Sequence, residues 1–137
     1  MTLRIVQLGK PRHANEGLRL GTVRRPPRGV PKSEFASRDY YDAWLPQLSP
    51  SPDLVKLALS SQADKDAKLW AAFTRHFRAE MKEGDAARLL DMLAALSHQT
   101  NLSLGCYCDD EAHCHRSVLR ALLEERGADI AGTPKAK

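Results

Sequence analysis

The sequence predicts a small, single-domain α/β fold in which helices flank a mostly parallel or mixed sheet in layers. Its 137 residues, 42% of them hydrophobic, suffice for one core and leave little room for a second. Short strand-like segments stand near both ends of the chain, with amphipathic helical segments between them. This order favours parallel pairing through right-handed crossovers. We expect residues 1–130 to form the domain and residues 131–137 to be a flexible tail.

Two strands are predicted in the first quarter of the chain. Residues 3–8 have aliphatic and β-branched side chains and are followed by Gly9 and Pro11. Residues 18–23 alternate apolar and polar side chains. The next segment, 24–29, contains two prolines that interrupt regular structure and stiffen the backbone around three arginines.

Helices are predicted through the middle of the chain. We expect residues 40–45 to be partly helical, ahead of Pro46. Ser51 and Pro52 are typical of an N-cap and a first helical residue. Apolar side chains that recur every three or four residues predict a core-facing helix over residues 69–81.

The pattern predicts that the helix over 69–81 ends by Gly84 and that Asp85 caps another, whose leucines extend to Leu96. A last strand is expected over residues 102–107, followed by a loop and an amphipathic helix that ends before Gly127.

Positive charge is concentrated at the start of the chain. Residues 1–32 hold eight Lys and Arg against the single Glu16, a balance of +7, whereas the other residues carry 13 Lys and Arg against 16 Asp and Glu. Such a surface attracts phosphate-bearing molecules, nucleic acid or acidic proteins, although a solvated basic face has the same pattern.

Several classes of protein are disfavoured. No apolar run approaches the length of a membrane span or a signal-peptide core, so we expect a cytoplasmic protein with no membrane partner. The three cysteines lie between Cys106 and Cys114, too close together for a secreted disulfide framework. No glycine-rich nucleotide-binding motif occurs, and no cofactor is indicated.

Residues 106–117 hold three thiols, two imidazoles, three carboxylates and a guanidinium between the last predicted strand and helix. Ligands of open α/β sheets bind at the carboxyl ends of strands, and a helix N-terminus attracts anions. Cys114 is expected at the start of the last helix, where His115 and Arg116 favour its thiolate. The neighbouring acids oppose that ionisation, and a small buried thiol is the alternative.

Zinc is a further alternative, with Cys106, Cys108, Cys114 and either His113 or His115 as ligands. The spacing argues against it, because structural zinc sites pair cysteines two to four residues apart and take the second pair from another segment. We therefore assign no metal ligand.

Three motifs resemble the YeaO-like proteins, domain of unknown function 488, over most of residues 3–127. They are Arg24-x-x-Pro27-Arg28-Gly29, Trp44-Leu45-x-x-Leu48-x-Pro50-Ser51 and Cys106-x7-Cys114-His115-Arg116-Ser117. Many relatives have Asp-Arg-x-Trp-Pro-Arg-Gly where this chain has the residues from Val23 to Gly29, without the acidic and aromatic members. The resemblance implies an α/β domain and a thiol paired with a cation, and it leaves the reaction open.

Two functions remain in view. The first is a small enzyme or binding domain for a phosphate-bearing anion, with Cys114, His115, Arg116 and Cys106 as catalytic candidates. Its ligand-binding candidates are Arg24, Arg28 and Ser117. The second is a non-catalytic module that binds nucleic acid or an acidic partner through the basic N-terminal segment. A weaker third is a redox or metal-linked role for the cysteines.

Overall fold

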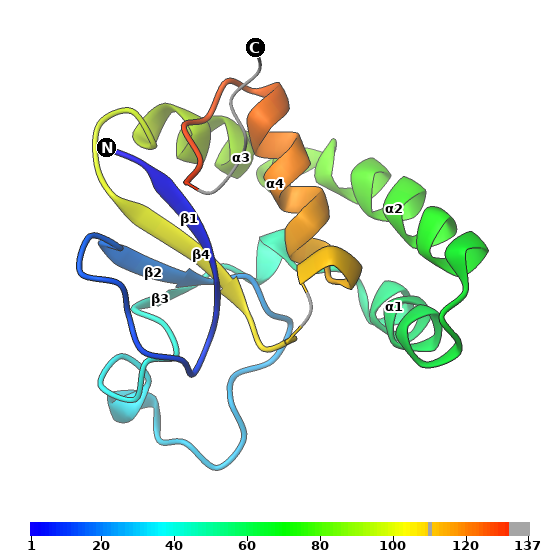
Figure 1. Cartoon of the computed structure of the whole chain (residues 1–137), viewed down its shortest axis with the longest axis horizontal. Coiled ribbons are helices and arrows are strands. Elements are labelled where there is room, and N and C mark those ends of the chain that lie inside the picture. The colour runs from blue at the N-terminus through cyan, green and yellow to red at the C-terminus, as the bar shows by residue number, and fades with distance from the viewer. Residues whose placement is uncertain (110, 132–137) are drawn as a thin grey trace.

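A computed structural model describes residues 1–109 and 111–131, which fold into four α-helices and a four-stranded parallel sheet (Figure 1). The strands are β1 (Leu3–Gln7), β2 (Leu18–Gly21), β3 (Ala43–Trp44) and β4 (Leu102–Cys106). The helices are α1 (Pro52–Asp64), α2 (Ala67–Met81), α3 (Gly84–Leu96) and α4 (His115–Glu125). The α/β class expected from the sequence is thus confirmed. The tail expected over 131–137 lies, apart from Ala131, outside the described residues.

The last strand occupies the inside of the sheet. The strand order is β1-β4-β2-β3, so β4 pairs with both N-terminal strands, and Leu102 lies opposite Leu3 on one side and Leu18 on the other. Because all pairs are parallel, the carboxyl ends of β1, β4 and β2 lie at one edge of the sheet. The loop that joins β4 to α4 lies at that edge.

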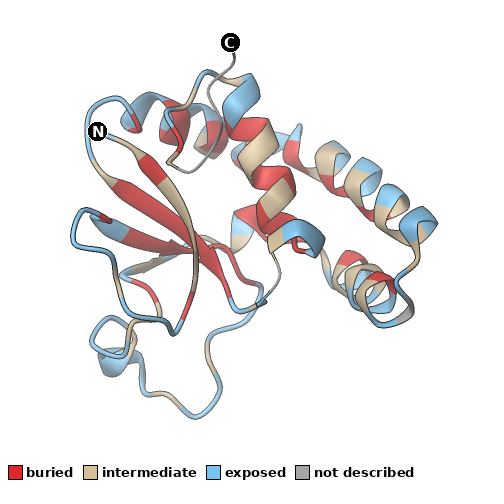
Figure 2. Cartoon of the chain, in the orientation of Figure 1, coloured by how far each residue is buried: buried red, intermediate tan, exposed pale blue. Residues whose placement is uncertain are grey.

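The helices gather on one side of the sheet, where they share a core with it (Figure 1). Helix α2 buries Phe73, Phe77 and Met81, as the predicted periodicity requires. Helix α4 lies close to β4. Its apolar side chains form a continuous stripe that packs into the core, and Figure 2 shows these positions as buried. Its fully enclosed members include Leu119 and Leu123.

The opposite face of the sheet is covered by irregular chain instead of helices. Two glycines allow this covering to lie directly on the strands: a Cβ on Gly105 would come 2.4 Å from a methyl carbon of Leu8, and a Cβ on Gly21 would come 2.4 Å from the ring of Tyr41. Both distances are far below van der Waals contact. Glycine is therefore required at these positions by the close approach of residues 8–17 and 22–42.

A buried ion pair also lies on this face. Arg19 and Glu16 are 1% and 2% exposed, and the Arg19 Nη2 atom donates to Glu16 Oε2 over 2.9 Å. The second carboxylate oxygen accepts from Arg19 Nε and Ser103 Oγ, and the His13 backbone N–H donates to Oε2. These bonds compensate for removing both charges from water. Residue 19 is thus a buried structural arginine, although the sequence counts it within the basic segment.

Two predicted helical details are wrong. Residues 40–45 are not helical, because Asp42 N–H donates to Arg19 O and Leu45 N–H donates to Gly21 O, which places Ala43 and Trp44 beside β2 as an edge strand. The cap of α3 is also displaced. Glu83 is its N-cap and Gly84, with φ of 54°, is its first residue, so Asp85 lies in the first turn.

Among the described helices, none has the length and apolar character that crossing a bilayer requires.

Candidate functional site

A cluster of three cysteines, a histidine and an arginine lies at the carboxyl edge of the sheet. Cys106 is the last residue of β4, and Cys114 is the N-cap of α4. The loop between them places their sulfur atoms 3.4 Å apart in the buried interior. The last helix therefore begins at Cys114, as the sequence predicts. We call Cys106, Cys108, Cys114, His115 and Arg116 the cysteine centre.

The Cys114 sulfur has three polar neighbours and is 1% exposed. Besides Cys106 Sγ, it lies 3.6 Å from His115 Nδ1 and 3.5 Å from Arg116 Nε. Its backbone position at the N-terminus of α4 adds the positive end of the helix dipole. Each of these features favours a negative charge on the sulfur.

The tautomer of His115 is fixed by the backbone of residue 22. The Nε2 atom lies 2.6 Å from the Thr22 carbonyl oxygen, which only accepts, so Nε2 carries a proton and donates it. The Thr22 hydroxyl donates to Gly105 O, and the ring packs edge-on against Phe77 of α2. In the neutral imidazole, Nδ1 is therefore the unprotonated nitrogen that faces Cys114.

Arg116 holds three parts of the centre together. Its Nη1 atom donates to Val6 O at the end of β1, and Nη2 donates to Cys108 O in the loop, both over 2.6 Å. With Nε on the Cys114 sulfur, every nitrogen of this buried guanidinium has a partner. Arg116 thus supplies fixed positive charge and positions the loop.

The three thiols differ in acidity because they share hydrogen bonds. Donation from Cys106, then from Cys108, and the neighbouring His115 lower the pKa of Cys114, and they outweigh the effect of burial. Hydrogen bonds with Cys108 and Cys114, together with burial, raise the pKa of Cys106. For Cys108, a bond from Cys106 lowers the pKa, but donation to Cys114 and burial outweigh it, so this pKa is raised. The three thiols therefore titrate as a coupled group in which Cys114 is the most acidic member.

Cys108 connects the centre to a surface pocket of about 540 Å³. The thiol lines this pocket with Asp109 and His113 of the loop, opposite the turn from α1 to α2, which contributes Lys65 and Trp70. The loop is joined to α1 by a hydrogen bond from Gln62 Nε2 to His113 O. The volume is within the range of small-molecule sites.

The donors of Cys106, Cys114 and His115 lie within 4.8 Å of one another, a grouping that could hold a thiophilic metal ion. Two features oppose this. Two thiolates on a tetrahedral zinc ion lie about 3.8 Å apart, whereas these sulfurs are 3.4 Å apart, a hydrogen-bonding separation. A cation would also lie close to the Arg116 guanidinium.

The structure brings together four of the seven site residues expected from the sequence, Cys106, Cys114, His115 and Arg116. Ser117 lies in the first turn of α4, where its hydroxyl donates to the Cys114 carbonyl. Arg24 is exposed, and its guanidinium donates hydrogen bonds to the carbonyl oxygens of Ser49 and Pro50. The Arg28 side chain is exposed and bonds to no described residue.

The sequence reasoning missed Thr22, which orients His115 across 93 residues. Its only sequence signal is a hydroxyl at the end of a predicted strand, a common feature. The segment that follows stays near the centre, since the Tyr107 hydroxyl donates to Arg25 O over 2.8 Å.

The fold and the site define a small parallel α/β domain with a cluster of cysteines, a histidine and an arginine where the inner strand meets the last helix. The chain belongs to the DUF488 family: the model of its active DUF488-N3 subclade, DUF488-N3a, matches residues 3–127. The resemblance to the YeaO-like proteins is thereby confirmed. No curated protein and no solved structure matches the chain.

Proposed function

We propose that this protein is a cysteine-dependent enzyme in which the Cys114 thiolate is the nucleophile and the ligand is a small phosphate-bearing anion. The observation that carries the proposal is the set of contacts around the Cys114 sulfur, which lies within 3.6 Å of a thiol, an imidazole and a guanidinium. A structural thiol needs none of these partners. The description of the matching subclade as active supports a catalytic role.

The residues of the centre would divide the chemistry as follows. His115 takes the thiol proton at Nδ1 while Nε2 stays bonded to Thr22, so an imidazolium and a thiolate form together. Cys106 donates to the thiolate and is the less acidic partner. Arg116 acts through position and charge, because its hydrogen bonds fix the loop and the Cys114 sulfur around one buried cation.

The ligand would enter by the pocket beside Cys108. Since Cys114 is buried, attack requires the loop of residues 107–113 to move aside, and Cys108 is the first thiol met on this path. The loop is joined to α1 through exposed contacts such as Gln62 to His113. Arg25 and Arg28, exposed on the segment tied to Tyr107 and outside the lining of this pocket, would add positive charge for the anion at longer range.

The test is alkylation of the native protein with iodoacetamide across pH, with each cysteine followed separately by mass spectrometry. Cys114 is expected to react with an inflection below the ordinary thiol pKa of 9.0, and Cys106 and Cys108 above it. A phosphate-bearing substrate analogue should slow the alkylation of Cys114. A matched variant, Cys106→Ser, keeps a donor but should shift the Cys114 inflection, whereas Arg75→Gln on the exposed surface of α2 should leave it in place.

Three outcomes contradict the proposal. All three thiols reacting only above pH 9 would make the centre structural. Stoichiometric zinc in protein purified without chelator, with alkylation restored by its removal, would assign the cluster to metal binding instead. Unchanged Cys114 protection in an Arg25→Gln, Arg28→Gln variant would remove that segment from the ligand site.

Residues 22–42 favour a second candidate, binding of nucleic acid. This segment exposes five cations and one unpaired acid, Glu34, and it extends away from the helices in Figure 1. The cations are Arg24, Arg25, Arg28, Lys32 and Arg38. Phosphate contacts of this kind release counterions on binding, so affinity falls steeply with salt.

A salt titration with a double-stranded DNA probe separates the two functions. If the segment binds nucleic acid, Arg25→Gln with Arg28→Gln reduces the salt slope by about two phosphate contacts, while Cys114→Ser leaves binding unchanged. No binding at low salt would exclude this candidate.

A further inference from the structure

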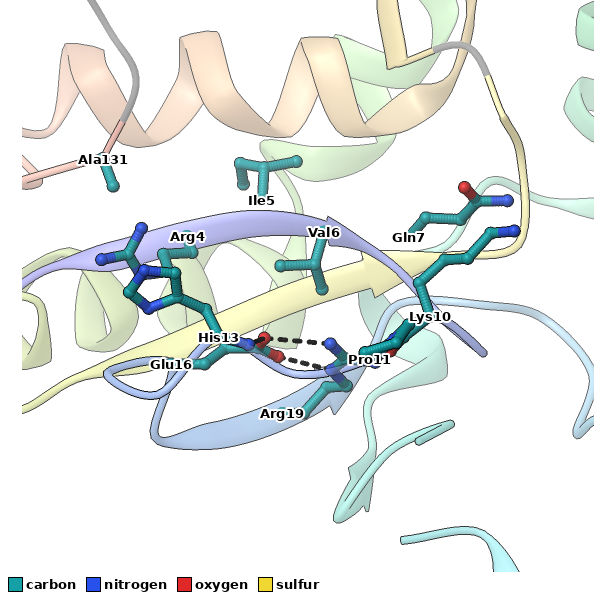
Figure 3. A pocket seen from close by; sticks show the side chains of 10 residues that line it. All are labelled: Arg4, Ile5, Val6, Gln7, Lys10, Pro11, His13, Glu16, Arg19 and Ala131. Atoms are coloured by element: carbon teal, nitrogen blue, oxygen red, sulfur yellow. Dashed lines mark hydrogen bonds and ion pairs between the residues drawn. The ribbon is translucent and has the colours of Figure 1, made fainter. Parts of the chain in front are cut away.

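A second pocket, of about 360 Å³, lies along β1 at the edge of the sheet and belongs to neither proposed function (Figure 3). Its lining combines residues of β1 with the irregular segment 10–17, with Arg19 of β2 and with Ala131. The charged and titratable side chains among them are Arg4, Lys10, His13, Glu16 and Arg19. The cysteine centre contributes nothing to this lining.

The floor of the pocket is electrically neutral, and its charged groups bond mainly to one another and to the backbone. Glu16 accepts four hydrogen bonds, two of them from Arg19, as Figure 3 shows in part. The remaining nitrogen of Arg19, Nη1, donates to the carbonyls of Lys10 and Asp39. A ligand would therefore gain nothing from this ion pair beyond contact with its surface.

The walls, in contrast, hold donors without partners. The Arg4 Nε atom is buried and has no hydrogen-bond partner, and no described residue forms an ion pair with its guanidinium. His13 Nδ1 accepts from the Asn15 N–H over 3.0 Å, so in the neutral ring Nε2 carries the proton and donates. The Lys10 ammonium has no partner among the described residues.

We infer that this pocket binds a small dianion of the phosphate class. Because the charges of Glu16 and Arg19 cancel, Arg4 and Lys10 give the lining a net charge of +2, which attracts an anion; the phosphate would contact Arg4 and His13, with Lys10 contributing at longer range. Figure 3 places Arg4 and His13 toward one end of the pocket and Lys10 toward the other. Arg4 therefore lines the pocket as a cation without a counter-charge among the described residues, and its Nε forms no hydrogen bond that a ligand would have to displace.

Isothermal titration of the full chain with inorganic phosphate at constant ionic strength tests the inference, and methyl phosphate in place of phosphate distinguishes a monoester from the free ion. Arg4→Gln should weaken phosphate binding at least tenfold. Arg75→Gln, which removes an equal charge from the exposed surface of α2, should change it less than twofold. Cys114→Ser should bind phosphate as the wild type does, which separates this pocket from the cysteine centre.

Stability without phosphate gives an independent readout. Arg4→Gln removes a buried donor that has no partner, so the phosphate-free variant should unfold at the same temperature as the wild type or higher. A folded Arg4→Gln variant with wild-type phosphate affinity would overturn the inference. So would a phosphate response that sodium chloride reproduces at equal ionic strength.

Discussion

Replacing Glu16 by Gln tests whether the covering of the helix-free face depends on the buried ion pair. The carboxylate accepts from Arg19 Nε, Arg19 Nη2, Ser103 Oγ and the His13 N–H. A glutamine keeps one acceptor oxygen but presents an NH₂ group to two of these donors, and it leaves the guanidinium buried without a counter-charge. Breaking a buried pair in this way costs about 3–5 kcal/mol.

For a chain of this size, that loss corresponds to a fall in Tm of about 10–15 °C. Chemical denaturation followed by circular dichroism measures the change in the free energy of unfolding. Glu34→Gln is the matched control, because Glu34 is exposed on the same face and forms no ion pair with the described residues, so its change should stay within about 0.5 kcal/mol. A loss for Glu16→Gln below about 1 kcal/mol, the range of surface pairs, would refute the reasoning.

The pH dependence of stability gives the same pair a second test. Burial alone would raise the pKa of Glu16, but hydrogen bonds from Arg19, His13 and Ser103 outweigh it and lower the pKa below the ordinary 4.5. The carboxylate thus contributes stability above pH 4.5 that is lost as the pH falls through the folded-state pKa. The difference in stability between wild type and Glu16→Gln should therefore shrink on acidification below pH 4.5. A difference that stays constant to pH 2 would contradict the assignment.

Three further substitutions probe the core and the site. Gly105→Ala places a methyl group against Leu8 and should cost about 1–3 kcal/mol, measured by denaturation; an unchanged midpoint would show that Leu8 moves freely. Leu119→Ala empties a fully buried position and should cost about 2–5 kcal/mol, and a smaller loss would mean that α4 collapses onto the gap. His115→Gln removes the imidazole that lowers the pKa of Cys114 and should move the Cys114 alkylation inflection to higher pH. An unmoved inflection would assign the acidity to the other thiols alone.

The sequence predicted the elements whose side chains repeat a regular pattern. The strands at 3–7, 18–21 and 102–106 and the helix over Ala67–Met81 follow from local periodicity. Strand β3 did not, because two residues have no pattern of their own and become a strand only by pairing with β2. Local composition around residues 40–45 is equally compatible with a helical turn.

The composition of the sequence predicted where the site lies, but it did not predict the contacts among the site residues. The sequence places the thiols together, yet their burial and the 3.4 Å separation of the Cys106 and Cys114 sulfurs depend on β4 lying between β1 and β2, a tertiary fact. The partners of Arg116 are backbone carbonyls of Val6 and Cys108, and every residue has such an oxygen, so no side-chain pattern identifies them. The burial of Arg19 could not be predicted either. An arginine in a basic segment is expected to be exposed, and only the position of its strand in the sheet shows that it is buried.

The position of β4 inside the sheet also determines when the protein can fold during synthesis. Strands β1 and β2 are made first, but neither pairs with the other, and both must wait for residues 102–106 to leave the ribosome. Helices α1 and α2 contact each other locally and can form earlier. A chain dominated by such distant pairings folds slowly, and its two unpaired N-terminal strands are exposed to misassociation in the interval. The cysteine centre is consequently among the last parts of the domain to assemble, because it joins the end of β4 to the start of α4.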